Sequence, residues 1–318
     1  MKIPPALAAG NTVVVKPSEL TPFSGELFAD LVAEAGFPEG VVNILPGDAS
    51  AGEALVRHPL VEKVSFTGGL VTARKIAIAC AEQMKPTLME LGGKSANIVF
   101  DDANLDEAAE FGATRICLLS GQGCSLPTRL LVQRSISDEM VDRVKALAEA
   151  VVVGDPFDLA TATGPVVNEA AMVRILGMIE RARDSGARLI TGGSRLTGDL
   201  ANGFYIEPTV FADVDPRSEL AQNEVFGPVL AMTPFDTEQE AIVIANGTEY
   251  GLSGYIQTRD VTRALRVAEE LLAGDLHING YDRSAGRPFG GLKLSGHGKE
   301  GGRHGLDEFL RVKAVSVN

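Results

Sequence analysis

Cys124 stands in a segment that reads LLSGQGCSLPTRLLV, between two apolar runs. A helix-like stretch ends in Ser-Gly before the cysteine and a strand-like stretch begins after Pro127, so the thiol lies on a connection between packed elements. A loop is where a reactive side chain would be presented, and a thiolate is a strong nucleophile. From this segment alone, the alternative is a small buried hydrophobic residue, as cysteines most often are.

Two glutamates stand at turns that follow apolar runs. Glu90 lies in the segment MELGGKS, and two glycines follow it closely, so its carboxylate stands at a strand end where the backbone turns sharply. Glu224, with Phe226 close behind it, precedes a Gly-Pro turn in QNEVFGPVL. The first pattern alone is weak evidence of a site, and the second is equally typical of an ordinary turn.

Two further segments have features of a cofactor site. In VVVKPSE, Lys16 and Glu19 flank a strand end that a helix follows, and doubly wound sheets hold the ribose of a dinucleotide at such a place. In SFTGGLVTARK, Gly68 and Gly69 lie between a strand and a helix, as in a loop that binds phosphate at a helix N-terminus. A solvated charged loop and a common glycine turn are the alternatives from these stretches alone.

The composition excludes several classes of partner. The chain has 318 residues, which is long enough for two domains of ~100–200 residues each. Its net charge of -13 argues against binding to a nucleic acid, which requires clustered Lys and Arg. The 3 cysteines and 4 histidines have neither disulfide nor metal-ligand spacing, which predicts a reduced cytoplasmic protein without a metal. No run reaches the ~18 apolar residues of a membrane span, so no membrane association is predicted.

The elements that position these residues alternate in type along the chain. From residue 11 onward, short β-branched runs alternate with amphipathic stretches, which predicts βαβ units, a parallel sheet and an α/β fold. We expect a dinucleotide-binding domain over 1–92, a second α/β domain over 93–291 that contains the cysteine, and a C-terminal segment over 292–318. Near the end, the sequence predicts a loop for PFGGLKLSGHGKEGG and a final strand for FLRVKAVSV.

Together these segments resemble the aldehyde dehydrogenase superfamily. Six of them follow that family's order at very similar separations: PALAAGNTVVVKPSE, FTGG, MELGGKS, SGQGC, NEVFGPV and PFGGLKLSG. The resemblance covers essentially all of the chain, and its most specific part is the joint occurrence of the glutamate and cysteine motifs. It implies an incomplete Rossmann-type cofactor domain, a complete α/β catalytic domain and a C-terminal oligomerisation strand.

The resemblance also implies a role for each candidate residue. Cys124 would attack the aldehyde carbonyl and hold the acyl group as a thioester after hydride transfer. Glu90 would be the general base for the water that hydrolyses the thioester, and its presence favours the hydrolytic type over the coenzyme-A-acylating relatives. The residues that would bind the cofactor are Lys16, Pro17, Ser18, Glu19, Phe66, Thr67, Gly68, Gly69, Leu91, Gly92, Glu224 and Phe226.

The implied cofactor is NAD in preference to NADP, because a carboxylate at Glu19 would repel a 2′-phosphate. The implied substrate is a small-molecule aldehyde, and its identity does not transfer because Gly123, in the part of the loop that lines the family's substrate pocket, is unusual. Three other residues depart from the family's pattern, namely Gly69, Ala73 and Leu126. Of these, Gly69 replaces a serine whose hydroxyl would contact the pyrophosphate.

The first residue aligns with a point well inside the family's chains. We therefore expect roughly the first third of a full-length relative to be absent, including sheet strands, an oligomerisation hairpin and an asparagine that helps to hold the oxyanion. Two functions stay open. One is an aldehyde-oxidising enzyme, a homo-oligomer in its full-length form, whose start lies upstream or whose activity is impaired. The other is a non-catalytic remnant that associates with other chains through its C-terminal strand.

Overall fold

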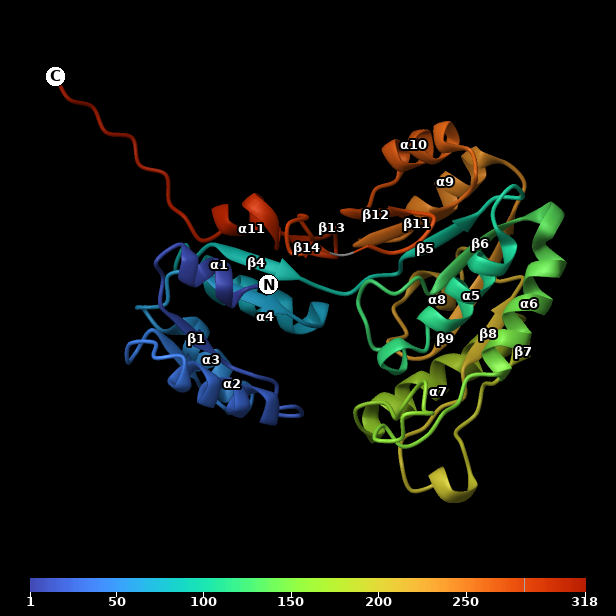
Figure 1. The fold of residues 1–318 in the computed structure, drawn as a ribbon, viewed down its shortest axis with the longest axis horizontal. Coiled ribbons are helices and arrows are strands. Elements are labelled where there is room, and N and C mark those ends of the chain that lie inside the picture. The colour runs from blue at the N-terminus through green and yellow to red at the C-terminus, as the bar shows by residue number, and fades with distance from the viewer. Residues whose placement is uncertain (283) are drawn as a thin grey trace. The chain divides into compact units, whose positions relative to one another are not determined.

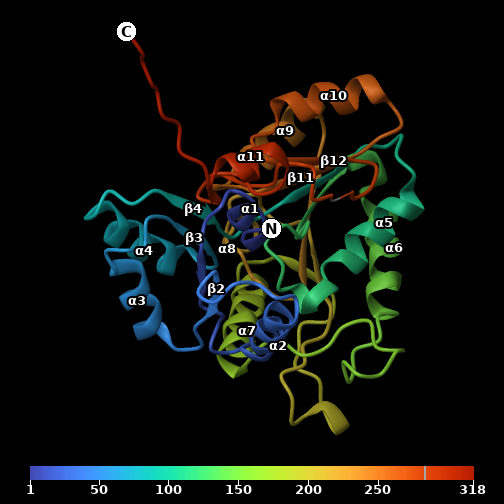
Figure 2. The ribbon, with the colours of Figure 1, turned by 60° about the vertical axis from the view of Figure 1, so that its left-hand side comes forward.

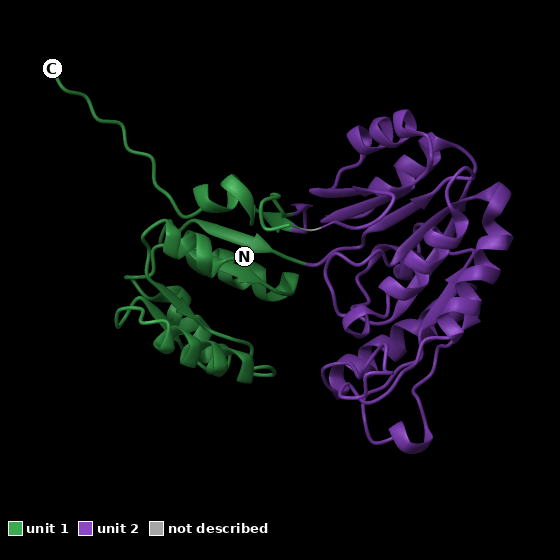
Figure 3. Ribbon diagram, in the orientation of Figure 1, with its two compact units in different colours: residues 1–91, 283–290, 296–318 green, residues 92–282, 291–295 purple. Residues whose placement is uncertain are grey.

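The chain forms two compact units, each with its own core (Figure 3). The structure is a computed structural model that describes residues 1–282 and 284–318. Unit 1 comprises 1–91, 283–290 and 296–318, and unit 2 comprises 92–282 and 291–295. Residues 283–290 and 296–318 thus group with the first unit, whereas the division from sequence had put them in the second domain and in a separate C-terminal segment.

Unit 1 is built from short strands that alternate with helices. Its strands are β1 (Val13–Val15), β2 (Val42–Ile44), β3 (Val64–Thr67), β4 (Thr87–Glu90) and β14 (Gly296–His297). Its helices are α1 (Ile3–Ala8), α2 (Phe23–Glu34), α3 (Ala49–Arg57), α4 (Leu70–Ala81) and α11 (Gly302–Asp307). β1 pairs in parallel with β2, while β4 pairs in parallel with β3 and antiparallel with β14. Strands form where the sequence predicted them in the runs from NTVVV to TLMEL.

The core of unit 1 is small. Its buried apolar residues fall into two clusters, which contain Val56, Ala79 and Cys80 in one and Ala73, Met89 and Leu91 in the other. On α2, the side chains of Phe23, Leu27 and Leu31 recur at four-residue spacing, so they share one face of the helix, and all three are exposed. Unit 1 therefore leaves much of its apolar surface in contact with solvent.

Unit 2 carries a larger set of elements. Its strands are β5 (Ala96–Val99), β6 (Arg129–Gln133), β7 (Arg188–Thr191), β8 (Thr209–Ala212), β9 (Val229–Phe235), β10 (Tyr250–Gly251), β11 (Ser253–Gln257), β12 (Asp275–Ile278) and β13 (Leu292–Lys293). Its α-helices are α5 (Leu105–Arg115), α6 (Ser137–Glu149), α7 (Glu169–Asp184), α8 (Glu219–Gln222), α9 (Glu238–Asn246) and α10 (Val261–Glu270). Its 3-10 helices are η1 (Leu118–Gly121), η2 (Arg134–Ile136) and η3 (Gly198–Leu200).

A seven-stranded sheet with the order β12-β11-β5-β6-β9-β8-β7 forms the centre of unit 2 (Figure 1). All its neighbours pair in parallel except β7, which runs antiparallel to β8. Consecutive residues of β6 point to opposite faces: Leu130 and Val132 pack with α5 and α6, and Leu131 packs with α9 and α10. Figure 2 shows α5 and α6 side by side on their face. Because helices cover both faces, apolar residues of the central strand β6 are buried on each side of the sheet.

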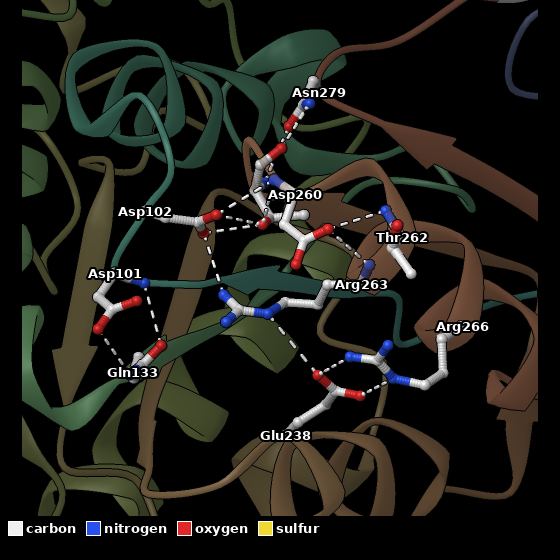
Figure 4. A network of polar contacts seen from close by, with 10 residues as sticks. Asp101, Asp102, Gln133, Glu238, Asp260, Thr262, Arg263, Arg266 and Asn279 are labelled. Carbon is white, nitrogen blue, oxygen red and sulfur yellow. Dashed lines mark hydrogen bonds and ion pairs between the residues drawn. The ribbon is translucent and has the colours of Figure 1, made fainter.

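The carboxyl edge of this sheet is held by a network of polar contacts (Figure 4). Asp102 follows β5 and accepts hydrogen bonds from the Thr258 hydroxyl at 2.7 Å and from the Arg263 guanidinium at 3.1 Å. Arg263 and Arg266 both pair with Glu238 at the start of α9. These charges therefore connect α9 and α10 to the strand ends at this edge of the sheet.

Two expectations from the sequence concern the C-terminal part of the chain. The segment FLRVKAVSV, predicted as a final strand for association with other chains, pairs with no strand of this chain, because residues 310–318 belong to no described strand. A strand exists only where a partner takes its N–H and C=O groups, and the alternation of residue types does not reveal whether a partner is there. The predicted loop over PFGGLKLSGHGKEGG contains the two short strands β13 and β14. Among the described residues, no helix has the length and apolar character needed to cross a membrane.

Candidate active site

Cys124 lies in a turn between η1 and β6, as its sequence context predicted, and its side chain is partly exposed. Just before it, Leu119, Ser120 and Gly121 have φ angles of 53°, 56° and 74°, a left-handed conformation that costs free energy in residues other than glycine. The Ser120 hydroxyl is buried and donates a hydrogen bond to the carbonyl of Gly164 at 2.8 Å. The chain thus enters the cysteine turn through a strained segment that a buried hydrogen bond holds in place.

The other two thiols are buried. Cys80 packs in a cluster of unit 1, and burial raises its pKa. Cys117 lies in the main cluster of unit 2, where burial raises its pKa to about 12. A thiol with a raised pKa is a poor nucleophile near neutral pH. The partly exposed Cys124 is therefore the best placed of the three for covalent chemistry.

The lead-in segments of neighbouring strands meet beside Cys124 at the amino edge of the unit 2 sheet. Gly92 and Gly93 precede β5, and Gly227 precedes β9, which flank the strand that Cys124 leads into. A Cβ atom on Gly93 would lie 2.5 Å from the carbonyl oxygen of Cys124, and one on Gly121 would lie 2.0 Å from the carbonyl carbon of Gly227. No larger residue fits at either glycine without a shift of the backbone.

Glu224 lies against the same glycine pair. Its Oε1 accepts a hydrogen bond from the N–H of Gly93 at 3.0 Å, and a Cβ atom on Gly92 would lie 2.2 Å from its Oε2. Burial raises the pKa of Glu224, while the Gly93 N–H and the charges of Lys94 and Arg174 oppose that rise. A partly buried carboxylate is thereby brought next to the Gly93 backbone that contacts Cys124, which the sequence pattern alone did not require.

Phe226, predicted beside Glu224, has a φ of 51°, and its ring is partly exposed. The Gly227 that follows is confined by Ile175, whose Cδ1 would lie 2.6 Å from an added Cβ. A bulky residue in the left-handed region is rare and persists only where its surroundings impose it. The surrounding residues therefore impose the conformation of the NEVFGP turn, which argues against its interpretation as an ordinary turn.

Within unit 1, Glu90 is the last residue of β4, as predicted, and its side chain is buried. A Cβ atom on Gly290 would lie 2.7 Å from Glu90 Oε1, and Gly296 pairs with Glu90 across β14. The carbonyl of Glu90 accepts a hydrogen bond from the N–H of Gly68 at 3.1 Å. Glu90 is thus in contact with the segment near the C-terminus and also with the glycine loop.

The residues predicted to bind the adenosine ribose lie at the end of β1. Lys16 Nζ donates to the carbonyls of Pro17 and Gly47, both at 2.7 Å, and lies 3.6 Å from the carboxylate of Glu19. The Ser18 hydroxyl accepts a hydrogen bond from the N–H of Leu20 at 3.2 Å, and the Glu19 side chain is exposed. A carboxylate and an ammonium therefore stand together at a strand end.

The predicted phosphate loop follows β3, which contains Phe66 and Thr67. A Cβ atom on Gly68 would lie 2.5 Å from the ring of Phe66, so this position is restricted to glycine. Gly69 caps α4 without a side-chain hydrogen bond, and nothing lies within 4 Å of its Cβ position. The start of a twelve-residue helix thus offers backbone N–H groups in open space, which suits an anionic group.

The predicted residues fall into two groups, one in each unit. Unit 1 holds Glu90, Leu91, Phe66, Thr67, the glycine loop and the residues from Lys16 to Glu19, while unit 2 holds Cys124, Gly92, Glu224 and Phe226. Of the second group, the structure brings Cys124 and Glu224 together around the Gly92–Gly93 backbone, and no contact of Phe226 with that backbone is found among the described residues. Among the described residues, no group of His, Cys, Asp and Glu is arranged to hold a metal ion.

Two residues of the site region were not singled out from the sequence. Lys94 is buried two positions after Gly92, and the sequence GGKS signalled only a polar turn. Tyr255 donates a hydrogen bond to the carbonyl of Ser125, which follows the cysteine, at 2.7 Å. That contact joins residues 130 positions apart, so no local pattern could reveal it.

Comparison with known proteins identifies relatives of the whole chain. The model of the aldehyde dehydrogenase family matches residues 1–315. Betaine aldehyde dehydrogenase of Sinorhizobium fredii (strain NBRC 101917 / NGR234) is 46% identical over 314 residues, which are 98% of this chain and 64% of the relative. Betaine aldehyde dehydrogenase 1 of Rhizobium meliloti (strain 1021) is also 46% identical with the same coverage. The chain thus spans 64% of the length of these curated relatives.

The chain is also similar to solved structures of aldehyde dehydrogenases. A point mutant of betaine aldehyde dehydrogenase from Staphylococcus aureus in complex with NAD+ has a TM-score of 0.96 and 39% identity, covering 98% of this chain and 64% of its own. A mutant of aldehyde dehydrogenase C from Pseudomonas syringae, in complex with NAD+ and octanal, has a TM-score of 0.96 and 42% identity, covering 99% and 65%. The α/β fold predicted from the sequence is confirmed.

Proposed function

The chain belongs to the aldehyde dehydrogenase family, and from this membership we propose that it oxidises an aldehyde to a carboxylic acid with NAD. The observation that carries the proposal is the meeting of the Cys124 turn, the Gly92–Gly93 backbone and Glu224 at one edge of the unit 2 sheet. A partly exposed thiol beside a confined backbone, which a partly buried carboxylate also contacts, supports nucleophilic catalysis.

In this proposal, the Cys124 thiolate attacks the carbonyl carbon of the aldehyde and forms a C–S bond and a tetrahedral oxyanion. Backbone N–H groups at the turn stabilise that negative charge. When the oxyanion collapses, the former aldehyde hydrogen leaves with its electron pair, and a thioester on Cys124 is left. NAD, when bound, supplies the acceptor for this hydride.

Glu90 completes the reaction in the proposal. Its buried carboxylate takes a proton from a water molecule, whose oxygen then attacks the thioester carbon. A C–O bond forms, the C–S bond breaks, and Cys124 leaves as a thiolate while the carboxylic acid is released. The proton on Glu90 returns to solvent, so the thiolate and the base are both restored for the next cycle.

The residues present in unit 1 suit a dinucleotide. The open N-terminus of α4 at Gly69 suits the pyrophosphate, and the missing serine hydroxyl leaves the backbone N–H groups as donors. Lys16 and Glu19 at the end of β1 suit the ribose hydroxyl groups, and the exposed carboxylate of Glu19 disfavours a 2′-phosphate. Glu224 and Phe226 are assigned to the nicotinamide riboside. The relatives solved with NAD+ support the same cofactor.

Stopped-flow measurement of NADH formation tests the proposal. The chain is mixed with NAD and an aldehyde, and its Glu90→Gln variant is expected to give a burst of NADH, followed by turnover that is at least about tenfold slower than in the unaltered chain. A burst is expected because the base is needed for hydrolysis of the thioester more than for hydride transfer, and general base catalysis contributes about 10²–10⁴-fold. Cys124→Ala is expected to abolish the burst.

The matched control is Glu34→Gln, which removes an exposed carboxylate of α2 in the same unit and should leave both phases unchanged. If the unaltered chain forms no NADH with any of several aldehydes, the proposed activity does not hold for this chain. If Glu90→Gln turns over at the normal rate, Glu90 is not the base.

A further inference from the structure

Tyr255, on β11, makes a direct contact with the segment that presents the nucleophile. Its hydroxyl donates a hydrogen bond to the carbonyl oxygen of Ser125 at 2.7 Å, and Ser125 is the residue that follows Cys124. The tyrosine is only 2% exposed. The bond joins the loop to β11, a strand of the seven-stranded sheet, so it restrains the loop with respect to that sheet.

The position of the phenol ring is itself fixed on both sides. The ring of His277 stacks on it with a centroid distance of 5.2 Å and an interplanar angle of 14°, and the ring of Phe111 lies 5.3 Å away. His277 Nε2 lies 2.9 Å from a carboxylate oxygen of Asp275, and its Nδ1 accepts from the N–H of Asp282 at 3.4 Å. The histidine is thus held in one orientation, and the stack transmits that orientation to Tyr255.

Burial raises the pKa of the Tyr255 phenol, so its hydroxyl keeps its proton and can donate this hydrogen bond near neutral pH. The cysteine turn is then restrained at two places. Upstream of Cys124, the Ser120 hydroxyl bonds to the carbonyl of Gly164, and downstream the Tyr255 hydroxyl bonds to the carbonyl of Ser125. Between them, the carbonyl of Cys124 is in close contact with Gly93.

We propose that Tyr255 is a positioning residue for the nucleophile, acting through its hydrogen bond to the Ser125 carbonyl. The proposal rests on the proposed function of Cys124 and adds to it Tyr255, a residue of β11 in the seven-stranded sheet. Without the hydroxyl, the downstream restraint is lost and the partly buried carbonyl of Ser125 loses this donor, while the ring stack can stay as it is.

The Tyr255→Phe variant tests the proposal, and Tyr281→Phe is its matched control. Tyr281 belongs to the same aromatic cluster, with its ring 4.8 Å from that of His277, and within the described residues its hydroxyl makes no hydrogen bond to the cysteine turn. The rate of alkylation of each thiol by iodoacetamide at neutral pH is followed by mass spectrometry. Alkylation of Cys124 is expected to fall about tenfold in Tyr255→Phe, because a loosened turn aims its backbone N–H groups less well at the thiolate.

Two further readouts separate positioning from a general loss of structure. Cys117, buried in the same unit, should stay as unreactive in both variants as in the unaltered chain. The dissociation constant for NAD, from isothermal titration, should stay within twofold, while the rate of the NADH burst falls with the alkylation rate. Catalytic rates respond strongly to small misplacements, on the order of 10²-fold for about 1 Å.

Three results would overturn the proposal: an unchanged Cys124 rate in Tyr255→Phe, an equal change in Tyr281→Phe, or a parallel rise in Cys117 labelling, which would signal general opening. Failure of the proposed function looks different. In that case Cys124 is not the preferred target of alkylation even in the unaltered chain, which would overturn both conclusions. If Cys124 is reactive but its alkylation rate is the same in Tyr255→Phe, only the positioning role of Tyr255 is overturned.

Discussion

Lys94 places an amino group in the interior of unit 2, where a positive charge is costly. It is 2% exposed, and among the described residues its Nζ has no hydrogen-bond partner. Burial, aided by the nearby charge of Arg129, lowers the pKa of Lys94 to about 7, and the charge of Glu224 only partly offsets this. A small cavity of about 20 Å³, lined by Lys94 together with Ser95 and other residues, has room for one water molecule.

The Lys94→Met variant should be more stable than the unaltered protein at low pH. The folded-state pKa lies below the unfolded value of about 10.4, so the cost of burying the charge is complete below pH 7 and disappears as pH rises toward 10. At about 1.4 kcal/mol per pKa unit, we expect a gain of a few kcal/mol at pH 6 that shrinks toward zero at pH 10. Urea unfolding at several pH values measures it.

The exposed Lys145, on α6 of the same unit, supplies the control for this prediction. Lys145→Met should change the free energy of unfolding by less than about 0.5 kcal/mol at every pH, since surface substitutions rarely do more. A Lys94→Met gain that is the same at pH 6 and pH 10 would show that Lys94 is not neutralised by burial.

At the scale of elements, the sequence was informative where structure is local. The strand ends at Glu90 and the turn at Cys124 follow from runs of β-branched residues and from Gly and Pro, and both are found. The predicted C-terminal strand pairs with no strand of this chain, and the residues of the segment alone cannot show where a pairing partner lies. The Tyr255 bond to Ser125 and the contact of Gly93 with Cys124 depend on the order of strands, which brings distant segments together.

Gly121, three positions before Cys124, provides a test at the scale of elements. It has a φ of 74°, and a Cβ there would lie 2.0 Å from the carbonyl carbon of Gly227. Gly186, after α7, has a φ of 89° but open space around its Cβ position. Gly186→Ala should therefore cost only the left-handed conformation, about 1–2 kcal/mol.

Gly121→Ala should cost more than about 3 kcal/mol, because the backbone of the η1–β6 connection must also move. It should slow the alkylation of Cys124 as well, since that connection carries the thiol, whereas Gly186→Ala should leave the alkylation rate unchanged. The free energies come from urea unfolding and the rates from thiol labelling. Equal costs for the two variants would mean that the close approach of Gly121 to Gly227 is not tight in solution.

At the scale of the whole molecule, the two units differ in how much apolar surface they bury. Unit 2 has three clusters on the two faces of a seven-stranded sheet, whereas the clusters of unit 1 are small and α2 exposes Phe23, Leu27 and Leu31. Hydrophobic stabilisation scales with buried apolar area, about 25 cal/mol per Å². Unit 1 is therefore expected to be the less stable of the two, and the residues between Lys16 and Gly69 that are proposed to bind the cofactor share its lower stability.

Each unit contains one buried cysteine, which makes this difference measurable in a single experiment. Cys80 lies in the core of unit 1 and Cys117 in the main cluster of unit 2, and both are inaccessible while their unit is folded. In pulsed alkylation across a urea series, we expect Cys80 to become labelled at a lower urea concentration than Cys117. Between the two midpoints, unit 2 should still react at Cys124 as in the absence of urea, because its sheet holds the turn. Coincident midpoints would show that the chain unfolds as one cooperative body, and earlier labelling of Cys117 would show that buried area does not set the order of stability here.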